Sequence, residues 1–476
     1  MELLNFTRGT YLQSLCGHAK LAMTRNPEAA RDTLTPLIQQ ELAKIKHNAD
    51  GYWGTTESDR SYAEKLTALQ TILSAENMEH LAVLSEEIAG ETINKVKIVF
   101  LTQETMCWPS FESLYRACSE DDRYIAQIVY IPFNHPNVSK HIDYFSIYKK
   151  MGLPVQRHDE YALAQESPDI AVFMKAYDLI PMQYYIDDIE KAVPRHLYIQ
   201  YGMEVGAQYI DYHFRLSLQS KVWRHIAYGS LLKETAAKYG TRNGENVVVW
   251  GNPRADYYRN LKVDRKTIPA AWKKKINGRF CFLWTPHHSL DTTCGSFLDY
   301  HVPIMKYFEK HPDIFLLWRP HPLLLDSLVV NGVMTKVERD AFLNKVVGMD
   351  NAILDTTPDY RQSFFASDAI ITDASTFIFE YLYTGRPLIY TKKAKNAIYN
   401  AERFEKGVYL IEQATDIASM LDQITEGKDP LRSERALLRK DLLFTPENST
   451  VGQYIADRCY EDLIQELNHH IGDSKY

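Results

Sequence analysis

Residues 369–391 read AIITDASTFIFEYLYTGRPLIYT, and this stretch decides the fold class of the chain. An apolar β-branched run leads through a polar turn into an apolar-rich helical segment, and a second apolar run follows. This order predicts a compact strand–helix–strand (βαβ) unit. Asp373 or Ser375 is suited to begin the helix, and Gly385, two residues before a proline, is suited to end it.

The turn after the first strand is a candidate phosphate site. The first N–H groups of a helix lack partners within the helix, and the helix dipole favours negative charge there. The hydroxyls of Ser375 and Thr376 would add donors beside Asp373, and Glu380, one turn further on, would reach a ribose. The alternative from the local pattern is an ordinary capped helix between two buried strands.

Length and composition limit the class of protein. A chain of 476 residues predicts two or three domains, and its net charge of -7 argues against a nucleic-acid partner. The six cysteines are scattered without a CxxC pair, which predicts reduced thiols. We expect a cytoplasmic protein, because the sequence has neither the layout of a signal peptide nor a membrane-spanning apolar run.

Strand and helix patterns divide the chain into four parts. We expect a helical extension over 1–92, a Rossmann-like domain over 93–260, a basic connector over 261–279 and a second Rossmann-like domain over 280–476. The fold class is therefore α/β, with two doubly wound domains. Strands are expected at 96–101, 125–131, 170–174, 197–200 and 247–250, and then at 280–284, 314–318, 369–372, 388–390 and 408–411.

Basic side chains follow several strands of the second half, where a parallel sheet collects its ligands. His287, Arg319 and His321 lie just past predicted strands and suit a phosphorylated ligand. We expect His287 and His288 to diverge, so that one of them faces the cleft, and we predict no metal site. Arg254 follows the 247–250 strand, either in an ordinary turn or as an interdomain ligand contact.

These motifs resemble those of the CDP-glycerol glycerophosphotransferases, the family of teichoic-acid polymerases and primases. Residues 370–390 are similar to the family's ITD-x-S-S signature, Arg319-Pro320-His321-Pro322 to its R-x-H-P loop, and residues 251–256 to its G-Y-P-R-N-D turn. The resemblance covers about residues 190–410 in the same order. It implies a GT-B fold, in which two Rossmann-like domains face a cleft and the donor nucleotide lies mostly on the second.

The resemblance also implies an activity that needs no cofactor. Glycerol phosphate, or a related polyol phosphate, would pass from a CDP-activated donor to a hydroxyl of a cell-surface polymer or its lipid-linked primer, with release of CMP. This chemistry belongs to teichoic-acid or capsule synthesis in the cell envelope. His321 would protonate or stabilise the leaving CMP. Donor contacts would come from His287, Arg319, Asp373, Ser375, Thr376, Glu380 and Arg254.

One departure from the family affects the catalytic base. The family carries W-H-G-T-P in its first domain, and Tyr201 stands here where its histidine is expected. An unperturbed tyrosine, with a pKa of about 10, is poorly matched to that role. Tyr201 is then a substrate contact, and Glu204 or His213 would replace the base. Two alternatives stay open: a GT-B glycosyltransferase that uses a nucleotide sugar, and a non-catalytic nucleotide-binding relative.

The connector offers a route to the membrane surface. It holds seven Lys or Arg, with Trp272 beside Lys273, Lys274 and Lys275. Each basic residue near an anionic leaflet contributes on the order of 1 kcal/mol. The connector is therefore either a peripheral contact with the inner face of the membrane or a solvated linker.

Overall fold

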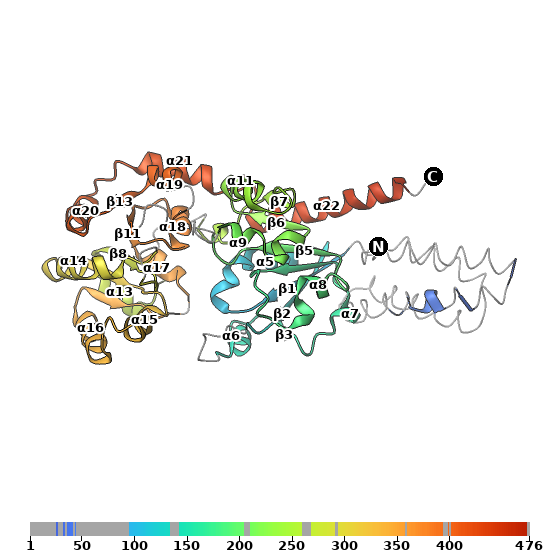
Figure 1. Cartoon of the computed structure of the whole chain (residues 1–476), viewed down its shortest axis with the longest axis horizontal. Helices are drawn as coiled ribbons and strands as arrows, with labels where there is room; N and C mark the ends of the chain where they lie inside the picture. The colour runs from blue at the N-terminus through green and yellow to red at the C-terminus, as the bar shows by residue number, and fades with distance from the viewer. Residues whose placement is uncertain are drawn as a thin grey trace.

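The computed structural model of the chain describes residues 25–26, 32–33, 36–40, 43, 95–133, 142–203, 210–258, 268–290, 294–357, 359–393, 398 and 401–473. Within them, two parallel sheets flanked by helices lie next to each other (Figure 1). This architecture confirms the predicted α/β class with two doubly wound sheets. The helical extension predicted over residues 1–92 lies almost entirely outside the described residues.

The first sheet has seven parallel strands in the order β3-β2-β1-β4-β5-β6-β7. Their bounds are β1 Val96–Thr102, β2 Tyr124–Tyr130, β3 Val155–Arg157, β4 Ile170–Phe173, β5 Arg195–Ile199, β6 Arg224–Ala227 and β7 Val247–Val249. All five strands predicted for this half are present. The winding reverses between β1 and β4, so the switch point, where such sheets bind ligands, lies at the carboxyl ends of these two strands.

Helices cover both faces of the first sheet. Along β1, Ile98 and Phe100 pack into one apolar cluster, whereas Val99 and Leu101 pack into another. This alternation explains the continuous apolar run in the sequence, because both faces of the strand are buried. The helices of this half are η2 Thr105–Ser110, α5 Glu112–Glu120, α6 Tyr144–Lys150, α7 Leu163–Glu166, η3 Met182–Tyr184, α8 Ile186–Ile189, α9 Ile210–Phe214, α10 Ser217–Lys221, α11 Ser230–Tyr239 and α12 Ala255–Tyr258.

The second sheet has six parallel strands in the order β10-β9-β8-β11-β12-β13. Their bounds are β8 Phe280–Thr285, β9 Ile314–Trp318, β10 Ala352–Leu354, β11 Ala369–Thr372, β12 Leu388–Thr391 and β13 Tyr409–Ile411. Its helices are α14 Phe297–Lys310, α15 Leu324–Val330, α16 Lys336–Gly348, α17 Arg361–Ala366, α18 Phe377–Glu380, η5 Tyr381–Thr384, α19 Ala401–Phe404, η6 Glu405–Gly407, η7 Ala414–Asp416 and α20 Ile417–Thr425. One apolar cluster runs from the first sheet into one face of the second, which joins the two halves.

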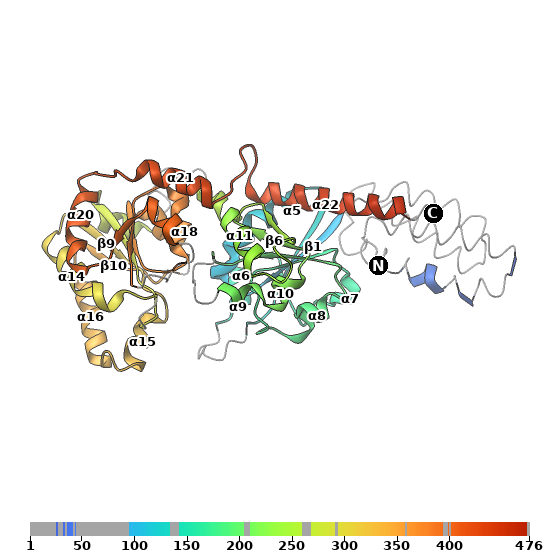
Figure 2. The same ribbon diagram turned by 45° about the horizontal axis from the view of Figure 1, so that its top comes forward.

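The chain ends by returning to the first sheet. After α21 Arg432–Leu442, helix α22 Val451–Asp473 lies along the first sheet and beside α5 (Figures 1 and 2). Val451, Ile455, Cys459 and Leu463 form a buried stripe with four-residue spacing. Arg224 anchors the helix by an ion pair with Asp462, 2.8 Å long. These contacts differ from what the predicted domain over 280–476 would suggest, and we propose that residues after 450 belong with the first domain.

The predicted basic connector is partly a packed helix. Helix α13, Ala270–Ile276, buries Trp272 in the core that the two halves share. Lys275 donates from Nζ to the backbone oxygen of Ala352, at 2.6 Å, and Arg279 donates to backbone carbonyls of neighbouring turns. These contacts fix the end of the connector to the second sheet. Among the described residues of the connector, Lys273 and Lys274 are the exposed basic side chains.

Candidate active site

The βαβ unit predicted from residues 369–391 is confirmed, with its helical segment in two parts. Helix α18 has four residues and continues as the 3₁₀ turn η5, which ends at Gly385 with φ of +69°, as predicted. The N-cap position is Thr376, and no side chain caps the helix. The expectation that Asp373 or Ser375 caps this helix is therefore wrong. A single helical turn supplies little dipole for binding phosphate.

Asp373 is fully buried and holds a neighbouring loop. Its carboxylate accepts hydrogen bonds from the backbone N–H groups of His287, at 3.0 Å, and Ser296, at 2.9 Å. Burial raises the pKa of Asp373 to about 6. The predicted donor contact of Asp373 is therefore corrected: this side chain joins the loops after β11 and β8, and it fixes the position of His287.

Three histidines meet at the carboxyl ends of β8 and β9. The ring centres of His287 and His288 lie 4.2 Å apart, those of His288 and His321 4.2 Å, and those of His287 and His321 5.3 Å. The expectation that His287 and His288 diverge is therefore wrong, because the loop between β8 and α14 is not extended. Gly295 lets it fold tightly, since a Cβ at this residue would lie 1.9 Å from the backbone oxygen of Ser289.

Hydrogen bonds to the backbone assign the protonation of two of these rings. Nδ1 of His287 accepts from the N–H of Ser289, at 3.1 Å, and Nδ1 of His321 accepts from the N–H of Leu323, at 3.2 Å. Burial and the neighbouring histidines lower the pKa of His321 to about 3, so its ring is neutral at pH 7. In a neutral ring whose Nδ1 is an acceptor, Nε2 carries the proton. Each of these two rings therefore presents one N–H donor.

This protonation suits an anion better than a metal ion. One ring nitrogen from each of the three histidines lies within 4.8 Å of the others, a spacing that could hold a metal. A metal ligand, however, must offer an unprotonated nitrogen, and such a histidine normally donates from its other nitrogen. Nδ1 of His287 and of His321 instead accepts a hydrogen bond. Phosphate oxygens match the two N–H donors.

The hydroxyls of the turn after β11 lie where the two halves approach each other. Ser375 Oγ is 3.2 Å from Thr372 Oγ1, and Ser375 and Thr376 are both partly exposed. A Cβ at Gly202, which follows β5 of the first sheet, would come within 3.0 Å of Cγ2 of Thr376. This predicted pair of hydroxyls therefore borders the joint between the two sheets.

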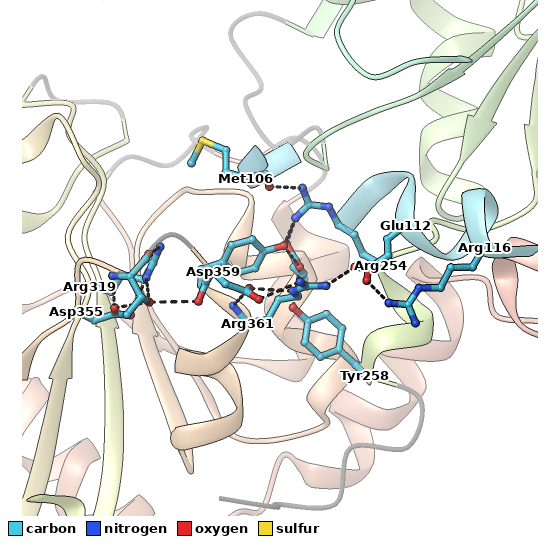
Figure 3. Close-up of polar contacts among 12 residues, drawn as sticks. Met106, Glu112, Arg116, Arg254, Tyr258, Arg319, Asp355, Asp359 and Arg361 are labelled. Carbon is cyan, nitrogen blue, oxygen red and sulfur yellow. Dashed lines mark hydrogen bonds and ion pairs between the residues drawn. The ribbon is translucent and has the colours of Figure 1, made fainter. Parts of the chain in front are cut away.

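Arg319 lies past β9 as predicted, but its guanidinium has partners within the protein. It pairs with the buried Asp355, at 2.7 Å, and donates to the backbone oxygen of Thr357, at 2.8 Å (Figure 3). These bonds hold the turn after β10. The predicted phosphate contact is therefore not supported by the geometry, because the guanidinium already serves as a brace between two loops.

Arg254 and Glu380 form a buried joint between the two halves. Arg254 Nη1 lies 2.9 Å from Glu380 Oε2, and both side chains are nearly inaccessible. Tyr258 donates to Glu380 Oε1 at 2.8 Å, and Tyr360 donates to the same oxygen at 2.5 Å. Burial raises the pKa of both tyrosines well above the ordinary value, so their hydroxyls stay protonated donors. The ribose contact predicted for Glu380 and the ligand contact predicted for Arg254 are therefore corrected to an interdomain role.

A second ion pair crosses the same joint beside this network. Arg361 of α17 lies 2.7 Å from Glu112 of α5 (Figure 3). On the first sheet, Arg254 also donates to the backbone oxygen of Tyr201 and, at 3.5 Å, to that of Met106. The segments after β1 and β5 are thus tied through Arg254 to the second sheet.

Tyr201 and the candidate base His213 lie at the carboxyl edge of the first sheet. Tyr201 follows β5 and is 37% exposed. His213 lies on α9, with its ring 6.1 Å from that of Tyr177, which follows β4. Glu204 lies outside the described residues.

Sequence reasoning missed a charged pair at the same edge. Lys175, after β4, is paired with Glu104, after β1, at 2.6 Å. Each is a charged side chain just past a buried strand, and the same rule that selected His287 and Arg319 would have found them.

Comparison with solved structures assigns the architecture. The wall teichoic acid polymerase TagF is 14% identical with a TM-score of 0.52, over 86% of this chain and 99% of that one. The S. aureus MnaA–UDP co-structure is 14% identical with a TM-score of 0.52, over 78% and 97% of the two chains. A UDP-N-acetylglucosamine 2-epimerase is 13% identical with a TM-score of 0.51, over 80% and 98%. The chain has the GT-B fold, as predicted, and identities this low show the fold alone.

The family match is more specific than the fold. Residues 226–455, slightly under half of the chain, match the model of the CDP-Glycerol:Poly(glycerophosphate) glycerophosphotransferase family, in agreement with the resemblance of the sequence motifs. The matched segment contains the second sheet, the three histidines and the turn after β11. No curated protein matches the chain significantly.

Proposed function

We propose that this chain is a transferase that moves glycerol phosphate, or a related polyol phosphate, from a CDP-activated donor to a hydroxyl of a cell-surface polymer or its lipid-linked primer. CMP is the leaving group. The observation that carries the proposal is the pair of N–H donors, on His287 and His321, at the carboxyl edge of the second sheet, inside the segment that matches the glycerophosphotransferase family.

In this proposal the second sheet binds the donor and the first sheet binds the acceptor. The donor diphosphate lies against the second sheet, where Nε2–H groups of His287 and His321 and the hydroxyls of Ser375 and Thr376 donate to its oxygens. The acceptor hydroxyl approaches from the first sheet and attacks the phosphorus that carries the polyol. His321, being neutral, stabilises the charge that develops on the leaving CMP by hydrogen bonding rather than by releasing an extra proton.

The main alternative is a glycosyltransferase that uses a nucleotide sugar, since the GT-B fold does not dictate the reaction. The structural neighbours are split, because one is a co-structure with UDP and another is a TagF variant soaked with CDPG. The family match favours the CDP-activated donor.

Nucleotide preference tests the proposal. We expect CDP and CTP to raise the melting temperature more than UDP or GDP, and CDP-glycerol with a soluble glycerol phosphate oligomer to release CMP. Calorimetric melting and chromatography of the products measure the two results. Preference for UDP would favour the nucleotide-sugar alternative. Nucleotide binding without product would indicate a non-catalytic relative.

Replacing the two hydroxyls after β11 should weaken donor binding. Each of Ser375→Ala and Thr376→Ala is expected to reduce nucleotide affinity about ten- to a hundredfold, because a hydrogen bond to a charged acceptor contributes about 1.5–3 kcal/mol. Titration calorimetry with CDP measures the change. Thr384→Ala is the matched control, since that hydroxyl binds the backbone of Tyr381 at the far end of η5. A lower melting temperature with unchanged CDP affinity would give Ser375 and Thr376 a purely structural role.

We further propose a reversible contact of α13 with anionic membrane surfaces. In the part of the chain that the structure describes, no helix is both long and apolar enough to cross a bilayer. Lys273 and Lys274 are exposed on α13, and two such charges contribute on the order of 2 kcal/mol at an anionic surface. Co-sedimentation with phosphatidylglycerol vesicles should fall with rising salt and in the double variant Lys273→Gln/Lys274→Gln. Vesicle binding that is unchanged by salt and by the double variant would exclude α13 as the membrane contact.

A further inference from the structure

Glu104 and Lys175 flank the switch point of the first sheet. β1 and β4 are neighbours, and Leu101 pairs with Phe173, so the two segments leave the sheet together. Glu104 lies two residues past β1, and Lys175 lies two residues past β4. In sheets of this topology the crevice between these strand ends is the place where ligands bind.

One carboxylate oxygen of Glu104 is buried without a well-aligned hydrogen bond. Lys175 Nζ donates to Glu104 Oε1 at 2.6 Å and lies 2.5 Å from Oε2, which accepts no hydrogen bond of good geometry. Lys175 is itself held by aromatic rings, 3.7 Å from the ring centre of Phe133 and 5.2 Å from that of Tyr201. The Lys175 side chain is 7% exposed and that of Glu104 17%. The carboxylate is thus positioned by a buried cation, and the Glu104 side chain as a whole remains partly exposed.

The same edge has further unused acceptors. The amide oxygens of Gln103 and Gln200, which follow β1 and β5, are buried and accept no hydrogen bond from the described residues. Buried polar atoms in proteins are normally paired, and each exception needs an explanation. Together with Oε2 of Glu104, these oxygens form a set of incompletely paired acceptors at this edge of the sheet.

Glu104 lies on the side of the first sheet that meets the donor site. Residue 104 immediately precedes η2, whose Met106 is tied to Arg254, and Tyr201 beside Lys175 is followed by Gly202, which approaches Thr376 of the second sheet. A continuous run of contacts therefore connects the Glu104–Lys175 pair to the turn where the donor phosphates are proposed to bind.

We propose that Glu104 is the general base of the transfer reaction and that Lys175 positions its carboxylate; this inference rests on the function proposed above. The acceptor hydroxyl oxygen forms a bond to the polyol-bearing phosphorus while its proton passes to the Glu104 carboxylate. The bond between that phosphorus and the bridging oxygen breaks, and CMP departs with the electron pair. A positioned proton acceptor contributes about 10²–10⁴-fold to such a step.

The chain offers a matched control pair in the same sheet. Lys97, at the start of β1, is buried and pairs with Glu166, which is 22% exposed. Asp169, beside the backbone N–H of Lys97, shows that this pair lies at the amino end of the strands, opposite the proposed acceptor site. Glu166→Gln therefore removes the same charge from the same kind of pair without touching the crevice.

The test uses the full chain with CDP-glycerol and a soluble glycerol phosphate oligomer. Glu104→Gln should lower kcat for CMP release at least a hundredfold with the affinity for CDP changed less than twofold, whereas Glu166→Gln should stay within threefold of wild type. Glu104→Ala, assayed with added formate, should regain at least tenfold in rate, because formate can take the proton. That rescue separates a base from a structural carboxylate.

Three results would overturn the inference. Glu104→Gln within threefold of wild type would exclude Glu104 as the base, and a hundredfold loss in His213→Gln alone would move the role to His213. A Glu104→Ala variant that keeps its fold and CDP affinity but gains nothing from formate would also exclude it. Failure of the proposed function is seen separately, as absence of CMP release by the wild-type chain, and it would remove the basis of the inference as well.

Discussion

His321→Ala is expected to lower turnover at least a hundredfold while leaving the fold intact. The ring is neutral, and its Nε2–H donor lies at the carboxyl end of β9 beside His287 and His288. A preorganised donor aimed at developing charge contributes about 10²–10³-fold. The loop should keep its conformation without the ring, because the backbone N–H of His321 donates to the backbone oxygen of Pro286 at 3.0 Å.

Rates of CMP release in wild type, His321→Ala and His321→Gln measure this effect. The glutamine amide retains an N–H donor, so it should keep more activity than alanine. Because the pKa of His321 is lowered to about 3, its protonation should add no change of rate between pH 6 and pH 8; protonation of this ring sets in only as the pH falls toward 3. Full activity in the alanine variant would remove His321 from the mechanism.

The strands could be predicted because their signal is local. A parallel strand buried on both faces is a continuous apolar run, and every run of this kind that the sequence indicated is a strand in the structure. β3 and β6 escaped prediction for a physical reason. In β3 only Val155 is buried, and β6 begins with Arg224 followed by His225, which burial keeps neutral by lowering its pKa to about 3. Neither segment shows an apolar pattern in the sequence. β10, also unpredicted, has only three residues.

The sequence could predict which edge of the sheet carries the candidate site, but not which side chains and backbone groups the site residues contact. The rule that ligands collect at strand ends placed His287, His321 and Ser375 at one edge of the sheet. The same rule could not show that Arg319 is paired with Asp355, 36 residues later, or that Asp373 binds a backbone 86 residues earlier. Such pairings depend on the folded arrangement of loops.

The sequence of α22 carries an apolar stripe that predicts its packing. The buried stripe from Val451 to Leu463 predicts a helix with one buried face. The stripe does not indicate which part of the protein covers that face. That surface belongs to the first sheet, more than two hundred residues earlier, where Arg224 and Asp462 pair. A linear division of the chain into domains could not anticipate this return.

Glu380→Ala is expected to lower the free energy of unfolding by about 3–5 kcal/mol, because it leaves the guanidinium of Arg254 buried without its counter-charge. Arg254 is 5% exposed, and Tyr258 and Tyr360 would lose their acceptor as well. The double variant Arg254→Met/Glu380→Leu should recover only the part of the loss that comes from the unpaired charge, since Tyr258 and Tyr360 still lack their acceptor.

Urea unfolding, followed by tyrosine and tryptophan fluorescence, measures these changes. Glu461→Ala is the control, because its ion pair with Arg458 is about half exposed and such pairs contribute about 0–1 kcal/mol. If Glu380 instead met the donor ribose, Glu380→Gln would weaken CDP binding and leave the urea midpoint unchanged. If Glu380 belongs to a buried joint, Glu380→Gln should instead lower the urea midpoint. CDP affinity should then change only if the relative position of the two sheets changes. The urea midpoint and the CDP affinity of the same variant therefore decide between a ligand contact and an interdomain joint.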